Sequence, residues 1–406
     1  MIEKIKTLGS VAKYVNGRAF KPSEWEKMGK PIIRIQNLTN SSEICNRTTK
    51  TYDEKFSVTR GDLLFSWSAT LGAYIWQGED AWLNQHIFKV IPNDGVGKLY
   101  LYYYLTFITN QLYEKAHGSG MVHITLKPFK ETEIPLPSLD EQQRIVELLD
   151  ELFSKLYEVK ALAQGVVDGS EFRRAAILHK AFTGELTELW RDEHGTTLDS
   201  WERRTVASVC KGLLYGTSKK STKLGKMIVL RMGNLQCGEI DWTDLAYSDD
   251  ENDIKKYRLS KGDVLFNRTN SAVLVGKTSI YRGEYPAIYA GYLIKLDYDH
   301  DILSGEYLNY VLNSPNAKEY YNRVKTDGVN QSNINARKIG EYVIPLPPLD
   351  EQKEIVRLLD DLLGREQRAK DLAGKTLERV EMIKKCILAR AFRGELTSNN
   401  FLRKIE

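Results

Sequence analysis

The stretch Ile134-Pro135-Leu136-Pro137-Ser138-Leu139-Asp140-Glu141-Gln142 returns 210 residues later as Ile344-Pro345-Leu346-Pro347-Pro348-Leu349-Asp350-Glu351-Gln352. A second marker behaves in the same way, because residues 181–187 (AFTGELT) return as residues 391–397 (AFRGELT) at the same offset of 210. The two markers are therefore equally far apart in both copies. Equal spacing predicts a rigid element of fixed length between them, and this internal repeat decides the architecture.

The rigid element is predicted to be a long helix in each copy. Prolines followed by Leu-Asp open it, and Asp140 with Gln143 forms a capping-box-like pair. Gly184 and Gly394 stand where a helix C-terminus would be capped. About 43 residues at ~1.5 Å each give a length of roughly 60–65 Å. Glycines within the predicted helices should weaken them, because each lowers helix stability by about 1 kcal/mol relative to alanine. These glycines are Gly165, Gly169, Gly364 and Gly374.

Apolar residues spaced by four and three predict one coiled-coil seam along each helix. The predicted seam residues are Ile145, Leu149, Leu152, Leu156, Val159, Ala163 and Val166 in the first copy, and Ala369, Ala373, Thr376, Val380, Ile383 and Ile387 in the second. The simplest partner for each seam is the other copy, in antiparallel pairing with an approximate two-fold axis. Alternatively, each helix packs on its own head, meaning the globular segment before it in the chain, or helices pair between two chains.

The repeat divides the chain into four segments. We expect head 1 at residues 1–139, a first helical spacer and linker at 140–200, head 2 at 201–349, and a second helical spacer and tail at 350–406. Short β-rich runs with many turn residues predict an α+β fold for each head, with a twisted or barrel-like sheet.

The two heads also resemble each other in sequence. Residues 61–66 (GDLLFS) match 262–267 (GDVLFN) at an offset of 201, whereas Gly118 and Ile124 match Gly328 and Ile334 at 210. Offsets that drift indicate loops of different length on one scaffold. The heads are therefore expected to look alike and to bind differently.

Charge is distributed unevenly along the chain, whose formal net charge is +4. Each head carries four more basic than acidic residues, and residues 140–200 carry six more acidic than basic ones. Contact with phosphate groups is therefore predicted for the heads.

Four widely separated cysteines without a CxxC pair favour structural thiols over a metal site. No run is apolar enough to span a bilayer and no signal-peptide pattern opens the chain, so a cytoplasmic location is expected.

This ordered set of repeated markers resembles the specificity subunits of type I restriction-modification systems. The carriers are the doubled Ile-Pro-Leu-Pro-x-Leu-Asp-Glu-Gln and Ala-Phe-x-Gly-Glu-Leu-Thr markers and the Gly-Asp-Leu/Val-Leu-Phe run in each head, and the resemblance covers essentially the whole chain. It implies two target-recognition domains that read an asymmetric, bipartite DNA target. It also implies assembly with two methyltransferase (modification) subunits and with restriction/translocase subunits. S-adenosylmethionine, and ATP with Mg²⁺, would belong to those partners, and no cofactor to this chain.

Enzymatic motifs are missing from the sequence. There is no Asn/Asp-Pro-Pro-Tyr/Phe motif for a flipped adenine and no glycine-rich turn for S-adenosylmethionine. Gly276-Lys277-Thr278 resembles the end of a P-loop, but Ser271 stands where the first glycine should be. No catalytic residue and no metal ligand are therefore predicted. A stand-alone DNA-binding regulator and a coiled-coil scaffold for protein interaction stay open as alternatives.

Candidate DNA-binding residues combine Arg, Asn and Gln, which suit base edges, with Lys and Ser, which suit phosphates. In head 1 they are Lys13, Tyr14, Arg18, Ser66, Trp67, Ser68, Thr70, His117, Ser119 and Lys127. In head 2 they are Tyr215, Thr217, Lys219, Asn267, Arg268, Asn270, Asn330, Gln331, Asn333 and Arg337. Ordinary polar turns and solvated charged faces are the alternative explanation. Arg34 and Arg231 are expected in the middle of strands, where structural pairing competes with base contact.

Overall fold

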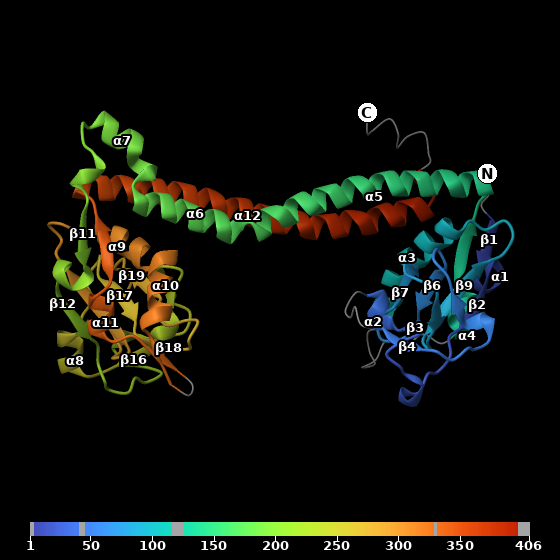
Figure 1. The fold of residues 1–406 in the computed structure, drawn as a ribbon, viewed down its shortest axis with the longest axis horizontal. Coiled ribbons are helices and arrows are strands. Elements are labelled where there is room, and N and C mark those ends of the chain that lie inside the picture. The colour runs from blue at the N-terminus through green and yellow to red at the C-terminus, as the bar shows by residue number, and fades with distance from the viewer. Residues whose placement is uncertain (1–3, 40–44, 116–125, 329–330, 397–406) are drawn as a thin grey trace. The chain divides into compact units, whose positions relative to one another are not determined.

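The computed structural model describes residues 4–39, 45–115, 126–328 and 331–396 (Figure 1). The chain divides into unit 1, with residues 1–164 and 374–406, and unit 2, with residues 165–373. Each unit holds one head, the start of the long helical segment that follows this head, and the end of the other long helical segment. Both units are thus built from the same three parts. Within the described part of the chain, no helix is long and apolar enough to cross a membrane.

Head 1 is built on two four-stranded sheets. One is antiparallel with the order β2-β9-β6-β7, and the other has the order β4-β3-β8-β5, in which β3 and β8 are parallel. A separate antiparallel pair joins β1 to β10. The strands are β1 (Lys4–Thr7), β2 (Ala12–Asn16), β3 (Lys30–Ile33), β4 (Asn46–Thr48), β5 (Ser57–Val58), β6 (Leu63–Ser66), β7 (Gly72–Ile75), β8 (Ala81–Leu83), β9 (Ile87–Pro92) and β10 (Glu133–Leu136). The helices are α1 (Leu8–Val11), α2 (Ile35–Leu38), α3 (Lys98–Lys115) and α4 (Leu126–Glu131), with 3-10 turns η1 (Pro22–Glu24) and η2 (Glu54–Phe56).

Head 2 repeats the first sheet and the parallel pair of this topology, but its second sheet has the three strands β16-β13-β20, and two small sheets, β14-β15 and β18-β23-β22, are added. The sheet β12-β21-β17-β19 corresponds to β2-β9-β6-β7, and β13 pairs in parallel with β20 as β3 does with β8. The α+β expectation is confirmed. The strands are β11 (Glu202–Thr205), β12 (Cys210–Tyr215), β13 (Met227–Leu230), β14 (Leu235–Gln236), β15 (Glu239–Ile240), β16 (Ala246–Ser248), β17 (Val264–Asn267), β18 (Thr269–Asn270), β19 (Thr278–Ile280), β20 (Ala287–Tyr289), β21 (Leu293–Tyr298), β22 (Thr326–Asp327), β23 (Ser332–Asn333) and β24 (Val343–Leu346). The helices are α8 (Glu251–Lys256), α9 (Gly305–Leu312), α10 (Pro315–Val324) and α11 (Ala336–Gly340), with 3-10 turns η5 (Val206–Val209) and η6 (Met232–Asn234).

The second long segment is one helix, as predicted, but the first is interrupted. Helix α12 (Leu349–Phe392) runs for 44 residues, whereas α5 (Leu139–Asp168) and α6 (Ser170–Thr183) are separated at Gly169. A Cβ atom at Gly169 would lie 2.5 Å from Nη1 of Arg173, whose guanidinium also bonds the Val166 carbonyl at 2.5 Å. The Arg173 guanidinium therefore bonds the Val166 carbonyl, which in a regular helix accepts only the amide four residues later. After α6 come η3 (Glu185–Thr187), α7 (Glu188–Glu193) and η4 (Leu198–Ser200).

The predicted C-terminal caps of the long helices are confirmed, whereas the N-terminal cap of α5 differs from the prediction. Gly184 has a φ of 87° and ends α6, and Gly394 has a φ of 72° just beyond α12, as their predicted capping role requires. At the start of α5, however, the hydroxyl of Ser138 accepts the Glu141 amide at 3.4 Å. Ser138, rather than Asp140, is therefore placed to cap this helix.

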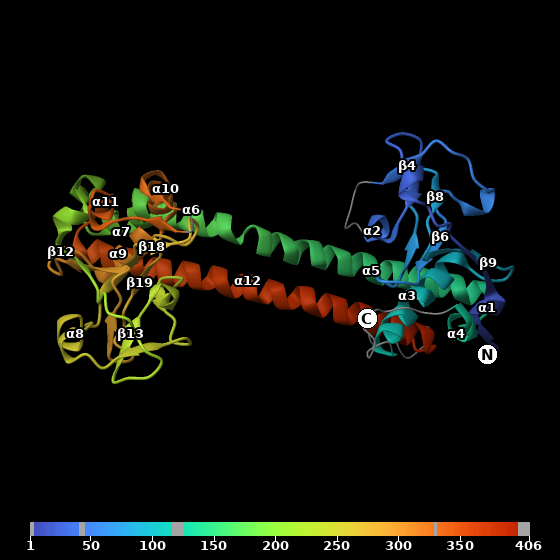
Figure 2. The same cartoon turned by 90° about the horizontal axis from the view of Figure 1, so that it is seen from below.

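Within each unit the two helical segments run antiparallel, which confirms the predicted pairing (Figures 1 and 2). In unit 1, Lys160 pairs with Glu381 at 2.6 Å and Lys384 donates to the Tyr157 hydroxyl at 3.0 Å. In unit 2, Arg173 pairs with Glu366 at 2.8 Å and Lys370 with Glu171 at 3.6 Å. In each unit the residue numbers rise in one segment as they fall in the other.

The predicted seam is only partly correct. Ile145, Leu149 and Val380 are buried, and Leu152, Leu156 and Ile387 are half-buried, but Val159 (42%), Ile383 (45%) and Ala369 are exposed. The helices pack on a head as well as on each other, so their buried face is not a simple two-helix seam. Ile355, Leu359 and Leu363, which the prediction omitted, are buried in the core of unit 2. The offset of 210 relates them to Ile145, Leu149 and Phe153, and this signal was available in the sequence.

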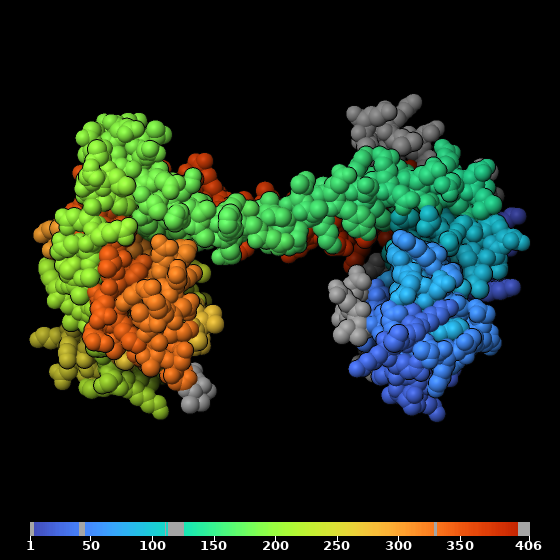
Figure 3. All heavy atoms as spheres, viewed as in Figure 1, coloured from blue at the N-terminus to red at the C-terminus, as the bar shows by residue number. Residues whose placement is uncertain are grey.

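The repeated Ala-Phe marker at each helix end packs on the head of the other repeat. Phe392, at the end of α12, lies in the core of unit 1, with its ring 5.5 Å from Tyr100 and 5.0 Å from Tyr104. Phe182, at the end of α6, lies in the core of unit 2, with its ring 5.8 Å from Tyr307. In the space-filling view, α6 and head 2 form one continuous surface (Figure 3).

The glutamine of the repeated Asp-Glu-Gln run is buried in both units. Gln142 accepts the Gly97 amide at 2.7 Å and donates to the Gly95 and Pro137 carbonyls. Gln352 accepts the Ser304 amide at 2.9 Å and donates to the carbonyls of Ile302 and Pro347, each at 2.8 Å. Each glutamine thus connects the first turn of a long helix to the loop before a head helix, α3 or α9. This contact explains a motif that the sequence only marked as repeated.

Replacing Gln352 with leucine is expected to lower the free energy of unfolding by about 1–3 kcal/mol, because buried backbone groups lose their partners. Urea denaturation with a fitted slope measures this loss. The control is Gln367→Leu on the same helix, where the amide bonds Asp371 at an exposed position. Its effect should stay within about 0.5 kcal/mol. Equal losses in the two variants would contradict the anchoring role.

Candidate nucleic-acid interface

The two heads arrange the same backbone positions around one group of loops. In head 1, Asn16 pairs with Phe88, which pairs with Phe65; in head 2, Tyr215 pairs with Ile294, which pairs with Phe266. This register makes Asn16 equivalent to Tyr215. We call residues 16–18, 66–68 and 84–86 loop cluster 1, and residues 215–217, 267–269 and 290–292 loop cluster 2.

Backbone hydrogen bonds confirm the equivalence of the two loop clusters. The Trp67 amide donates to the His86 carbonyl at 3.1 Å, and the Arg268 amide donates to the Tyr292 carbonyl at 3.1 Å. Likewise, residue 85 donates to residue 18 at 2.8 Å, and residue 291 donates to residue 217 at 2.7 Å. Trp67 and Arg268 therefore occupy the same position in the two heads. They are the first residues after strands β6 and β17.

Loop cluster 2 brings together candidates from three separate stretches of sequence. The Arg268 guanidinium lies 4.9 Å from the Tyr215 ring centroid, and its Nη1 donates to the Gly291 carbonyl at 3.5 Å. Strand β18 pairs with β23, where the Asn333 amide donates to the Thr269 hydroxyl at 2.8 Å. The Tyr215 hydroxyl accepts the amide of Ala336, the residue before Arg337. Asn270 and the exposed Gln331 belong to the same group of short strands and loops.

Loop cluster 1 carries different chemistry. The Trp67 indole donates to the Asn16 side chain at 3.2 Å, and its ring lies 5.0 Å from His86 and 5.6 Å from Phe88. His86 has a φ of 74°, a left-handed conformation that is rare outside glycine. Side-chain atoms of Arg18, Asn84 and His86 are buried without a hydrogen-bond partner among the described residues. Unsatisfied buried polar atoms of this kind call for an explanation, and a bound ligand is one.

Arg18 is already paired within head 1. Its guanidinium donates to Glu24 at 2.7 Å and lies 4.3 Å from the Tyr52 ring centroid. This hydrogen bond lowers the pKa of the Glu24 carboxyl to about 2 and raises the pKa of Arg18. Lys13, Thr70 and Lys127 are exposed elsewhere on head 1. The structure does not join them into one cluster with Arg18.

Four of the predicted contact residues are corrected by burial, and a fifth, Tyr14, is held by contacts within head 1. Ser66 and Asn267 end strands β6 and β17, which are buried throughout, and Ser68 is 8% exposed. Thr217 is buried and donates to Asp253. The ring of Tyr14 packs on Phe88 and Phe129, its hydroxyl donates to the Leu8 carbonyl, and burial raises its pKa. Ser66, Ser68, Thr217 and Asn267 therefore support the loops from inside the heads, and the half-buried Tyr14 uses its ring and hydroxyl within head 1.

Other predicted residues already bond groups within their own head, or lie outside the described residues. Lys219 pairs with Asp250 at 2.5 Å, and this bond lowers the pKa of the Asp250 carboxyl. Arg34 and Arg231 do not lie in mid-strand but directly after β3 and β13, where Asn37 and Asn234 accept their amides. Arg231 also pairs with Asp244 at 2.8 Å. Outside the described residues lie His117, Ser119 and Asn330.

The sequence reasoning missed Asn16, His86 and Tyr292. Their place in the loop clusters depends on which strands pair, and β2 and β9 are 70 residues apart. No local pattern reveals such a pairing. Among the described residues there is no group of His, Cys, Asp and Glu suited to a metal ion. The fold thus defines a class of protein: one with two copies of a head fold, whose equivalent loop clusters carry different polar and aromatic side chains.

A comparison with protein families specifies this class. The family model described as "Type I restriction modification DNA specificity domain" matches residues 3–164 and 199–371, and the chain belongs to this family. The chain is 27% identical over 416 residues to the EcoBI specificity subunit of Escherichia coli, covering 97% of this chain and 86% of that protein. It is 30% identical over 298 residues to the EcoKI specificity subunit of Escherichia coli strain K12, covering 71% of this chain and 63% of that protein.

Solved structures support the same fold. The HsdS subunit from Thermoanaerobacter tengcongensis matches with a TM-score of 0.62 at 21% identity, covering 97% of each chain. A chain from a structure on complex assembly and conformational transition of the type I R-M system matches with a TM-score of 0.67, also at 21% identity, over 97% of this chain and 98% of that chain. The predicted family and the prediction of a non-catalytic specificity subunit are confirmed. The comparisons support neither a stand-alone regulator nor a protein scaffold.

Proposed function

We propose that this chain reads an asymmetric, bipartite DNA target for a type I restriction-modification complex, with one half-site bound by each head. The observation that carries this proposal is the pair of equivalent loop clusters. They share a backbone, but Trp67 stands in one where Arg268 stands in the other. Side chains that differ at an equivalent position select different bases, so the two half-sites differ.

The proposed contact surface comprises the predicted residues that the structure leaves accessible, apart from Arg18 and Lys219, which already pair with Glu24 and Asp250. In head 2 these are Tyr215, Arg268, Asn270, Gln331, Asn333 and Arg337, and in head 1 Trp67 with Lys13, Thr70 and Lys127. We propose residues 1–139 and 201–349 as the target-recognition domains and residues 140–200 and 350–406 as the spacers. Family membership supports this assignment.

The proposed partners are double-stranded DNA, two methyltransferase subunits and, for cleavage, restriction/translocase subunits. S-adenosylmethionine, ATP and Mg²⁺ would belong to these partner subunits. Phe172, which is 78% exposed, lines a mainly apolar groove with Ala175, Ala176 and His179, and this groove supports a docking role for α6. Since the target is genomic DNA, we place the complex in the cytoplasm.

Co-expression with the methyltransferase encoded beside this chain tests the proposal. Methylated adenines are then mapped across the host genome. We expect a split, asymmetric motif that disappears when this chain is omitted. A methyltransferase that neither copurifies with the chain nor depends on it would overturn the proposal.

A further inference from the structure

Arg268 has no carboxylate partner in the described part of the chain, unlike three other cations of head 2. Lys219, Arg231 and Arg282 each have a carboxylate partner within 2.8 Å. Among the described residues, no carboxylate lies within 4.0 Å of the Arg268 guanidinium, and its buried Nε has no hydrogen-bond partner. A half-buried guanidinium is costly to leave in this state. Its Nη2 makes no hydrogen bond to the described residues, so a ligand with acceptor atoms can complete the site.

The structure also holds Arg268 in a defined orientation. Its amide donates to the Tyr292 carbonyl at 3.1 Å, and its carbonyl accepts the Ile334 amide at 2.9 Å. The guanidinium lies 4.9 Å from the Tyr215 ring centroid, and the Tyr215 hydroxyl is itself held by the Ala336 amide at 3.0 Å. Holding a long side chain in place before binding reduces the entropy lost on binding.

We propose that Arg268 is a specificity-determining residue that reads a guanine in the half-site bound by head 2, with Tyr215 as its positioning residue. The planar guanidinium presents two parallel donors, which match the N7 and O6 acceptors of guanine in the major groove. The equivalent residue in head 1 is Trp67, which offers one indole donor and no charge. Head 1 therefore lacks this guanine contact at its equivalent position. This inference rests on the proposed function.

The test uses the complex with its methyltransferase and oligonucleotides of the mapped target. Each guanine of the target is replaced in turn by 7-deazaguanine, which lacks the N7 acceptor. We expect one guanine at which this replacement, which removes one of the two acceptors, weakens binding by roughly 5-fold in the wild type and has no effect in Arg268→Ala. The genomic motif of Arg268→Ala should become degenerate at that same position and stay unchanged in the other half-site.

Two further variants separate base reading from other roles. Arg268→Lys keeps the positive charge but loses the two parallel donors of the guanidinium. The variant should therefore bind the target more weakly and discriminate less at that guanine. Lys219→Ala, which removes a carboxylate-paired cation of the same head, should leave the motif unchanged. Matching thermal unfolding curves for wild type and Arg268→Ala show that the fold is intact.

The inference fails if Arg268→Ala weakens binding to all sequences equally while Arg268→Lys restores it, because that pattern identifies a phosphate contact. It also fails if Arg268→Ala leaves the motif and every 7-deazaguanine effect unchanged. If the wild-type complex shows no split motif at all, the proposed function fails instead. The two failures are therefore distinguishable.

Discussion

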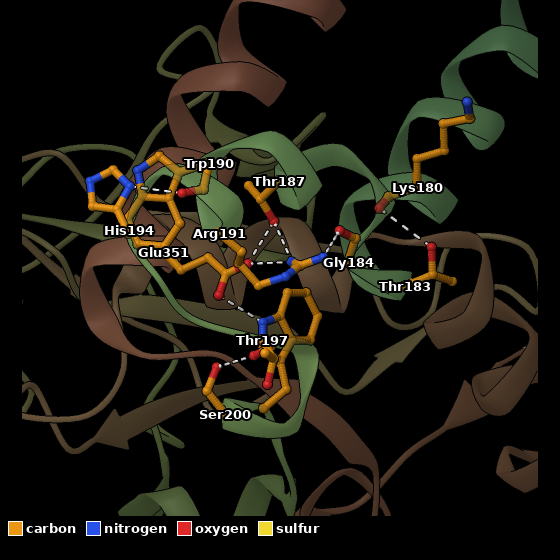
Figure 4. Close-up of polar contacts among 11 residues, drawn as sticks. Lys180, Thr183, Gly184, Thr187, Trp190, Arg191, His194, Thr197, Ser200 and Glu351 are labelled. Atoms are coloured by element: carbon orange, nitrogen blue, oxygen red, sulfur yellow. Dashed lines mark hydrogen bonds and ion pairs between the residues drawn. The ribbon is translucent and has the colours of Figure 1, made fainter.

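Replacing Arg191 with alanine is expected to lower the free energy of unfolding of unit 2 by about 3–5 kcal/mol. The Arg191 guanidinium pairs with Glu351 at 2.6 Å, and the two side chains are only 8% and 0% exposed (Figure 4). Without Arg191, a carboxylate would remain buried with only neutral donors, the Thr187 hydroxyl at 2.7 Å and the Trp201 indole at 2.8 Å. An uncompensated buried charge is among the costliest single changes a protein can carry.

The Arg191–Glu351 pair also connects two helical segments, and this adds to the expected loss of stability. Arg191 also donates to the Gly184 carbonyl at 2.7 Å, directly after α6, while Glu351 lies in the first turn of α12. One side chain therefore connects the end of one helical segment to the start of the other within unit 2.

Chemical denaturation followed by tryptophan fluorescence measures the loss, and Trp201 lies beside the pair as a reporter. The control is Arg282→Ala, whose pair with Glu239 is exposed, at 46% and 51%, and which should cost less than about 1 kcal/mol. Adding Glu351→Gln to Arg191→Ala should recover part of the stability, because it removes the buried charge. No difference between the Arg191 and Arg282 variants would refute the assignment.

Replacing Phe392 with alanine is expected to cost about 3–5 kcal/mol, and to act on unit 1 although the residue belongs to the second repeat. The Phe392 ring packs on Tyr100, Tyr104 and Phe107 of head 1. Removing it leaves a cavity in the core of unit 1. The equivalent change, Phe182→Ala, should act on unit 2, where the ring contacts Tyr307.

Hydrogen exchange read by mass spectrometry localises each effect to peptides of one unit. Phe392→Ala should speed exchange in α3 of head 1, and Phe182→Ala should speed exchange in α9 of head 2. Phe172→Ala is the matched control on α6, since that ring is 78% exposed and should matter by less than about 0.5 kcal/mol. Faster exchange in head 2 after Phe392→Ala would contradict the packing of each helix end on the other head.

The candidate site could be predicted only in part. The polar residues after the Gly-Asp-Leu/Val-Leu-Phe runs lie in the two loop clusters, and Trp67 and Arg268 are among them. Ser66 and Asn267 were wrongly included, because a strand end looks polar in sequence while the fold covers both of its faces. Asn16 and His86 were missed because only the pairing of β2 with β9 and β6 brings them to Trp67.

The sequence by itself determined the two repeated segments, their helical nature, the glycine caps Gly184 and Gly394, and the order of heads and helices. These features depend on neighbours within a few residues or on an exact repeat at an offset of 210, and both can be read along the chain. Only the tertiary structure decided that, of the four glycines expected as weak points, Gly169 is where α5 and α6 separate. It alone also decided that Val159 and Ile383 face solvent, and that Trp67 and Arg268 are equivalent. Burial and strand pairing depend on residues far apart in the chain, which no local pattern records.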